Sequence, residues 1–64
     1  MKKEYIDTNV GTICAIRLGV GFSTKGEIVN WFKVNDYFIA LNDKNHYIES
    51  SDIDPRDDYD FIRI

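Results

Sequence analysis

The sequence lacks the residues on which small domains usually rely for extra stability. Its 64 residues include one cysteine, Cys14, and one histidine, His46. An internal disulfide is therefore excluded, and these two side chains fall short of the four ligands of a structural zinc site. A chain of this length buries only about 60% of the surface that it exposes when unfolded. Association with other copies is the remaining route to stability, so we expect a homo-oligomer.

Long hydrophobic runs are also missing. No stretch approaches the roughly 20 apolar residues of a membrane-spanning helix, and the lysines of Met1–Asp7 precede no apolar segment. The sequence therefore predicts neither a signal peptide nor a membrane partner. Since a single unpaired cysteine suits a reducing compartment, we expect a cytoplasmic protein.

The charge is divided unevenly along the chain. The formal net charge is −3. Residues 1–48 carry six basic and five acidic side chains, a balance of +1, whereas residues 49–64 carry two basic and six acidic ones, a balance of −4. Because phosphate neutralisation dominates nucleic-acid affinity, this segregation argues against a nucleic-acid site only on the acidic side.

Short runs of β-branched, aromatic and other apolar residues predict an all-β domain over residues 1–64. The intervals between the runs leave no room for crossover helices, so consecutive strands are expected to pair antiparallel through tight turns such as Asn35-Asp36 and Asn42–Asn45. The expected strands are Gly11–Leu18, Glu27–Val34, Tyr37–Leu41, His46–Glu49 and Phe61–Ile64.

The remaining segments are expected to be loops or single turns. Residues 1–10 predict an N-terminal arm or a short helix, and Gly19–Gly26 predicts a loop. Residues 50–60 predict one acidic helical turn before the last strand, with Asp54 as its cap and Pro55 at its first position.

Two features of the predicted strands concern their packing. Both faces of Gly11–Leu18 are apolar, which predicts a strand buried on both sides and an inert, buried thiol at Cys14. The alternation of apolar residues shifts at Trp31-Phe32, which predicts a bulge or bend there, and leaves open which of the two rings faces the core.

Several stretches resemble the motifs of the Sm and LSm proteins. The run Ile16-Arg-Leu-Gly-Val-Gly-Phe22 with Gly26-Glu-Ile28 is similar to the first Sm motif, and Asp36-Tyr-Phe-Ile-Ala-Leu41 is similar to the end of that motif. Tyr47 to Ile53 repeats the spacing of the second motif. The resemblance covers residues 11–53 and implies a five-stranded barrel of the Sm-like or another SH3-like type. For the Sm family it also implies ring assembly and RNA contact.

Aromatic and basic residues around two predicted turns suggest a nucleic-acid site. Bases stack on exposed aromatic rings while lysines neutralise phosphates, and hairpin tips commonly present such contacts. We therefore expect a non-enzymatic module that binds single-stranded RNA or DNA. The residues of this predicted site are Trp31, Lys33, Tyr37, Lys44 and His46.

The acidic C-terminal segment supports an alternative of a different class. A small acidic phage or mobile-element protein could bind a host protein and inhibit or redirect it, with two aromatic residues as apolar anchors. The spacing of the acids does not match a calcium loop, because the required glycine and the final glutamate are missing. We expect neither a metal, a cofactor nor an enzymatic activity. The residues of this predicted interface are Asp57, Asp58, Tyr59, Asp60 and Phe61.

Overall fold

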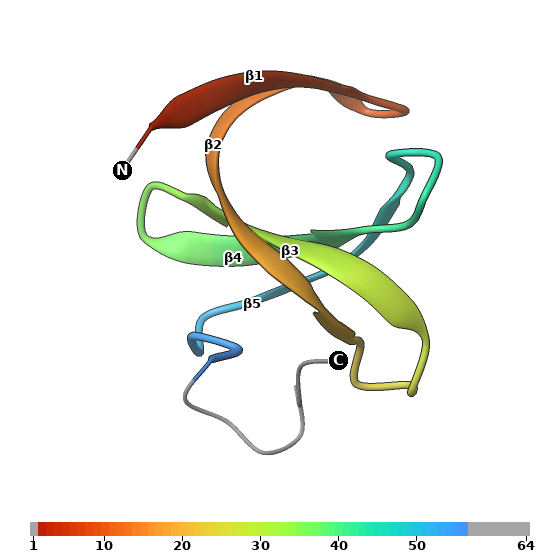
Figure 1. Cartoon of the computed structure of the whole chain (residues 1–64). Coiled ribbons are helices and arrows are strands. Elements are labelled where there is room, and N and C mark those ends of the chain that lie inside the picture. The colour runs from red at the N-terminus through yellow and green to blue at the C-terminus, as the bar shows by residue number, and fades with distance from the viewer. Residues whose placement is uncertain (1, 57–64) are drawn as a thin grey trace.

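A computed structural model of the chain describes residues 2–56 as one antiparallel sheet of five strands (Figure 1). Each strand pairs with the strand that follows it in the sequence. No helix occurs within residues 2–56, and hence none that could cross a membrane. The all-β, antiparallel prediction is confirmed. The strands are β1 (Lys3–Thr8), β2 (Gly11–Phe22), β3 (Ile28–Val34), β4 (Tyr37–Leu41) and β5 (Tyr47–Ser51).

Turn chemistry positions β3, β4 and β5 as the sequence predicts. Asn35 adopts a left-handed φ of 54° in the turn between β3 and β4, a conformation that asparagine tolerates. In the next turn the Asn42 side-chain oxygen accepts hydrogen bonds from the backbone N–H groups of Lys44 and His46, both at 2.9 Å. Local turn chemistry therefore favours both connections.

The N-terminal segment is a strand and not an arm or a short helix. Residues Lys3–Thr8 form β1, which pairs with β2 from Lys3 opposite Ile16 to Thr8 opposite Gly11. The prediction was wrong because only Ile6 in this strand is buried, so the segment lacks a clear apolar alternation. The strand conformation of this segment therefore depends on its pairing with β2, which the local sequence does not indicate.

Strand β2 continues through residues that were expected to form a loop. Gly19 and Gly21 pair with Trp31 and Val29 of β3, after a register shift between Arg17 and Gly19. Gly19 has a φ of 134°, which a residue with a Cβ rarely adopts. The predicted bulge is therefore present beside Trp31, but the extra residue lies on the partner strand β2.

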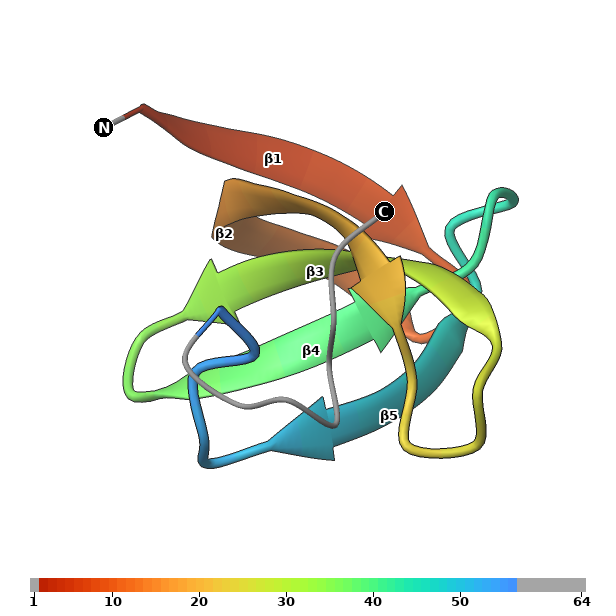
Figure 2. The same ribbon diagram turned by 60° about the horizontal axis from the view of Figure 1, so that its bottom comes forward.

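The sheet is curved, with β1 and the first half of β2 arching over β3 and β4 (Figures 1 and 2). We call the face that carries Phe32 the inner face and the opposite one the outer face. Phe32 is 1% exposed and Trp31 is 2% exposed, so both adjacent rings are buried, each in a different cluster. The inner cluster contains Ile6, Ala15, Phe32, Val34, Ile39 and Leu41. The outer cluster contains Val29, Trp31, Phe38 and Ala40.

Burial on the outer face does not extend to the first half of β2. Cys14 is exposed there, and Ala15 is the only buried residue between Gly11 and Leu18. The predictions of a strand buried on both sides and of a buried thiol were therefore wrong. Apolar residues on both faces show that a strand can be buried on both sides. The curvature of the sheet decides which part of that strand is buried.

The acidic segment shows no helical turn as far as Arg56. Asp54 instead accepts a hydrogen bond from the Arg56 backbone N–H at 2.9 Å and forms an ion pair with its guanidinium at 2.6 Å. Pro55 between them is buried. The expected continuation of this turn to residue 60 and the closing strand Phe61–Ile64 lie outside the described residues.

The loop between β2 and β3 depends on one buried hydroxyl. Ser23 is 1% exposed, and its Oγ accepts hydrogen bonds from the backbone N–H groups of Lys25 and Glu27 at 3.2 and 3.1 Å. We expect Ser23→Ala to lower the free energy of unfolding by roughly 1 kcal/mol, because two amides lose their acceptor. Urea denaturation measures this change. Ser50→Ala, at an exposed serine of β5, serves as the control, and an equal effect of both substitutions would contradict the role of Ser23.

Candidate nucleic-acid interface

The structure separates the five residues that the sequence grouped into a nucleic-acid site. Trp31 is buried, and its indole Nε1 donates a hydrogen bond to the Phe22 carbonyl at 3.2 Å. The ring faces of Trp31 are therefore covered by protein, and this residue does not offer a stacking surface. The prediction of Trp31 as a base-stacking residue therefore does not fit its burial.

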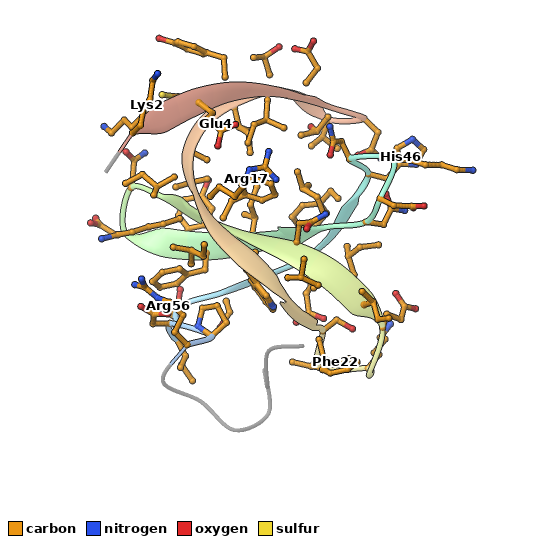
Figure 3. The ribbon with its side chains drawn as sticks, viewed as in Figure 1. Lys2, Glu4, Arg17, Phe22, His46 and Arg56 are labelled. Carbon is orange, nitrogen blue, oxygen red and sulfur yellow. The ribbon has the colours of Figure 1, made fainter. Side chains whose placement is uncertain are left out.

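The other four residues lie in three different places. Lys33 is exposed on the outer face, while Tyr37 lines a groove on the inner face. Lys44 and His46 belong to the turn between β4 and β5. Figure 3 shows His46 at one end of β1 and Lys2 at the other. The structure therefore does not bring these predicted residues together into one surface.

A basic row crosses three strands on the outer face. Lys3 of β1 pairs with Ile16 of β2, and Ile16 pairs with Lys33 of β3. Paired residues in neighbouring strands point to the same face, so both lysines flank the half-buried Ile16. Two strand spacings separate their backbones, about 10 Å. This distance allows two long lysine side chains to reach a common anion.

A second row, next to the lysines, carries an exposed aromatic ring. Side chains two residues apart on a strand share a face, so Tyr5 lies beside Lys3, about 7 Å along β1. Tyr5 is 83% exposed and pairs with Cys14 of β2. A hollow of about 200 Å³ is lined by both lysines, Cys14, Ile16 and Asn35. We call the surface formed by Lys3, Tyr5, Ile16 and Lys33 the basic–aromatic face.

Negative charges near this face lie mainly on its other side or at one end. Glu4 points to the inner face, where its carboxylate pairs with the Arg17 guanidinium at 3.2 Å (Figure 3). That guanidinium also lies 5.0 Å from the centre of the Phe32 ring. Asp7 follows Tyr5 on the outer face and accepts a hydrogen bond from the Thr12 hydroxyl at 2.8 Å. Lysine charges therefore dominate the row at Lys3, and an acid marks the opposite end.

Lys3 and Tyr5 were not predicted as site residues because their segment was expected to be an arm or a short helix. The sequence signal was weak, because in the other half of the alternation, which is Glu4, Ile6 and Thr8, only Ile6 is apolar. The buried Ile6 shows which half of this alternation faces the core. Their proximity to Lys33, thirty residues away, depends on the pairing of β1, β2 and β3.

The inner face holds a second candidate, an apolar groove of about 300 Å³. Its apolar lining includes Ile13, Ile39 and Leu41, together with Tyr37 and Tyr47, which are 42% and 40% exposed. The lining contains no charged side chain. Hence the groove offers apolar and aromatic contacts but no group that would neutralise a phosphate.

A bulge in β5 aims Tyr47 into this groove. Ala40 pairs with Glu49 and Leu41 pairs with Tyr47, so Ile48 is the extra residue. The bulge turns Tyr47 to the same side as Leu41, whereas Ile48 packs against the outer cluster. The Asn9 side-chain oxygen accepts a hydrogen bond from the Tyr47 backbone N–H at 2.8 Å, which ties the β1–β2 turn to the start of β5.

The predicted protein interface is not placed by the structure. Its five residues, Asp57 to Phe61, lie outside the described range. Within residues 2–56, no three histidine, cysteine, aspartate or glutamate side chains gather in a way that could hold a metal ion.

Comparisons with known proteins add no assignment: no family model, curated protein or solved structure matches this chain.

Proposed function

We propose that this protein is a non-enzymatic module that binds single-stranded RNA or DNA on its basic–aromatic face. The observation that supports this proposal is the alignment of Lys3 and Lys33 across three strands, with the exposed Tyr5 beside them. Cations next to an exposed ring suit a ligand that combines phosphates with stackable bases. The inner groove supports this ligand less well because its lining carries no charge.

The chemistry of the face sets the expected strength and salt dependence of binding. One base stacked on an aromatic ring contributes about 1–3 kcal/mol, and each phosphate contact to a single strand adds about −0.7 to the slope of log K against log salt concentration. Two lysines therefore predict a slope of roughly −1.4. This is a weak, salt-sensitive site with little sequence preference.

A direct titration tests the proposal. Fluorescently labelled RNA and DNA oligonucleotides of mixed sequence are titrated with the protein at low salt, and fluorescence anisotropy reports binding. We expect saturable binding that weakens with added salt and is poorer for duplexes, in which the bases are already stacked. Absence of binding to every single-stranded oligonucleotide at low salt would overturn the proposal.

Removal of the exposed ring isolates the stacking contribution. We expect Tyr5→Ala to weaken oligonucleotide binding roughly tenfold, since 1.4 kcal/mol corresponds to a factor of ten. Tyr47→Ala removes a ring of the inner groove and is expected to leave the affinity within about twofold. Anisotropy titrations of both variants measure the effect, and a larger loss in Tyr47→Ala would move the site to the inner groove.

We also propose that the curved sheet closes into a small barrel of the SH3-like or Sm-like type. The resemblance over residues 11–53 supports this, as does the hydrogen bond from Tyr47 to Asn9, which joins the first turn to the last strand. Ring assembly of several copies stays a prediction. Light scattering after gel filtration measures the assembly state, and a monomer at all concentrations would contradict it.

The inner groove favours a second candidate function, the binding of a protein partner. Apolar floors flanked by tyrosines are typical of interface centres, and no lysine lines this groove. A pull-down with the protein as bait tests it. A partner that is retained by Tyr5→Ala but lost by Tyr47→Ala would support this candidate, and loss with both or neither would contradict it.

A further inference from the structure

We infer that the basic–aromatic face binds the end of a single-stranded oligonucleotide, and specifically an end that carries no phosphate. This inference rests on the proposed function and specifies its ligand. In the expected complex the terminal base stacks on Tyr5, the last phosphodiester lies between Lys3 and Lys33, and the strand leaves the face past the lysines.

The order of charges along the outer face carries this inference. Lys3, Tyr5 and Asp7 occupy successive same-face positions of β1, about 7 Å apart. A positive row is thus followed by an aromatic row and then by a carboxylate. A ligand with the complementary order has a phosphate, then a base, and then a group that is not anionic.

Asp7 is fixed in place and has capacity for another hydrogen bond. Its Oδ1 accepts the bond from the Thr12 hydroxyl, and a carboxylate has two oxygens with about four acceptor sites. A terminal sugar hydroxyl is a donor that suits this group. A further phosphate at the same place would instead meet the oxygens of an acidic side chain, which cannot donate a hydrogen bond to it as a hydroxyl donates to the carboxylate.

The acid at the end of the row determines the direction in which the oligonucleotide leaves. An oligonucleotide that continued past Tyr5 would carry its phosphates towards the Asp7 carboxylate. The lysine row is followed by no such acid on β1, so the remainder of the strand is expected to leave on that side.

Four oligonucleotides of one sequence test the inference: one with hydroxyls at both ends, one with a 5′ phosphate, one with a 3′ phosphate, and a circle. We expect the doubly unphosphorylated strand to bind best, a phosphate at one of the two ends to weaken binding about tenfold, and the circle to bind as weakly. The sensitive end identifies which hydroxyl lies at Asp7.

The outcomes separate this inference from the proposed function. Equal binding of the circle and the linear strands, or tighter binding of a phosphorylated strand, would overturn end recognition and leave single-strand binding standing. Failure of all four oligonucleotides to bind would overturn the proposed function itself.

The variant Asp7→Asn provides a matched test of the mechanism. We expect it to abolish the penalty of the terminal phosphate, so that the three linear oligonucleotides bind within about twofold of one another. Asp43→Asn makes the same change in charge in the β4–β5 turn and is expected to retain the tenfold difference. Retention of the difference in Asp7→Asn, with a native circular-dichroism spectrum, would overturn the assignment of Asp7.

Discussion

Replacement of Phe32 by alanine is expected to unfold most of the protein. Phe32 is 1% exposed and lies in the inner cluster with residues from β1, β2 and β4. Truncation of a buried phenylalanine typically costs about 3–5 kcal/mol. A domain of 64 residues has a total stability of only about 3–10 kcal/mol, at 0.05–0.15 kcal/mol per residue. This one substitution therefore removes a large share of the free energy of unfolding.

Thermal and urea denaturation followed by circular dichroism measure this loss. The matched control is Tyr5→Ala, which removes an aromatic ring of similar size from the exposed outer face and is expected to change stability by less than about 0.5 kcal/mol. A loss below 1 kcal/mol in Phe32→Ala would show that the inner cluster does not stabilise the fold in the way that its burial indicates.

Charge reversal at the basic row is expected to abolish oligonucleotide binding. The double variant Lys3→Glu/Lys33→Glu replaces both cations of the face by anions, so that attraction of phosphates becomes repulsion on both sides of Ile16. We expect the affinity at low salt to fall at least about 100-fold, and the residual binding to lose its salt dependence, because no counterions are released.

A second double variant controls for net charge. Lys25→Glu/Lys44→Glu changes the formal charge by the same amount, from −3 to −7, but at exposed positions in other turns. We expect it to weaken binding only a few fold, through the general field of the protein. Equal losses in the two variants, with both folded by circular dichroism, would show that total charge and not this face governs the interaction.

Local sequence was sufficient to predict most of the sheet. Asn35 tolerates a left-handed φ and Asn42 hydrogen-bonds the backbone of its own turn, so the hairpins of β3, β4 and β5 follow from chemistry within a few residues. The apolar runs between them have few alternatives to a strand at this spacing. The segment at Lys3–Thr8 was missed because one buried residue in six gives too weak a pattern.

The candidate site was predicted much less well than the fold. Trp31 was predicted to offer its ring for base stacking, but the structure buries the indole in the outer cluster. Lys33 is exposed, as a binding role requires, whereas its neighbours on the face, Lys3 and Tyr5, were not grouped with it. Composition indicates which residue types are available for binding, but not which of them share a surface.

The amino-acid sequence by itself determined the class of fold, the antiparallel order of the strands and the positions of the tight turns. These depend on side-chain alternation and turn chemistry, which act over a few residues. The tertiary structure decided which face of each strand is covered and which distant side chains meet, such as Lys3 with Lys33. Those properties depend on register, and a single extra residue at Leu18 or Ile48 shifts every pairing that follows it.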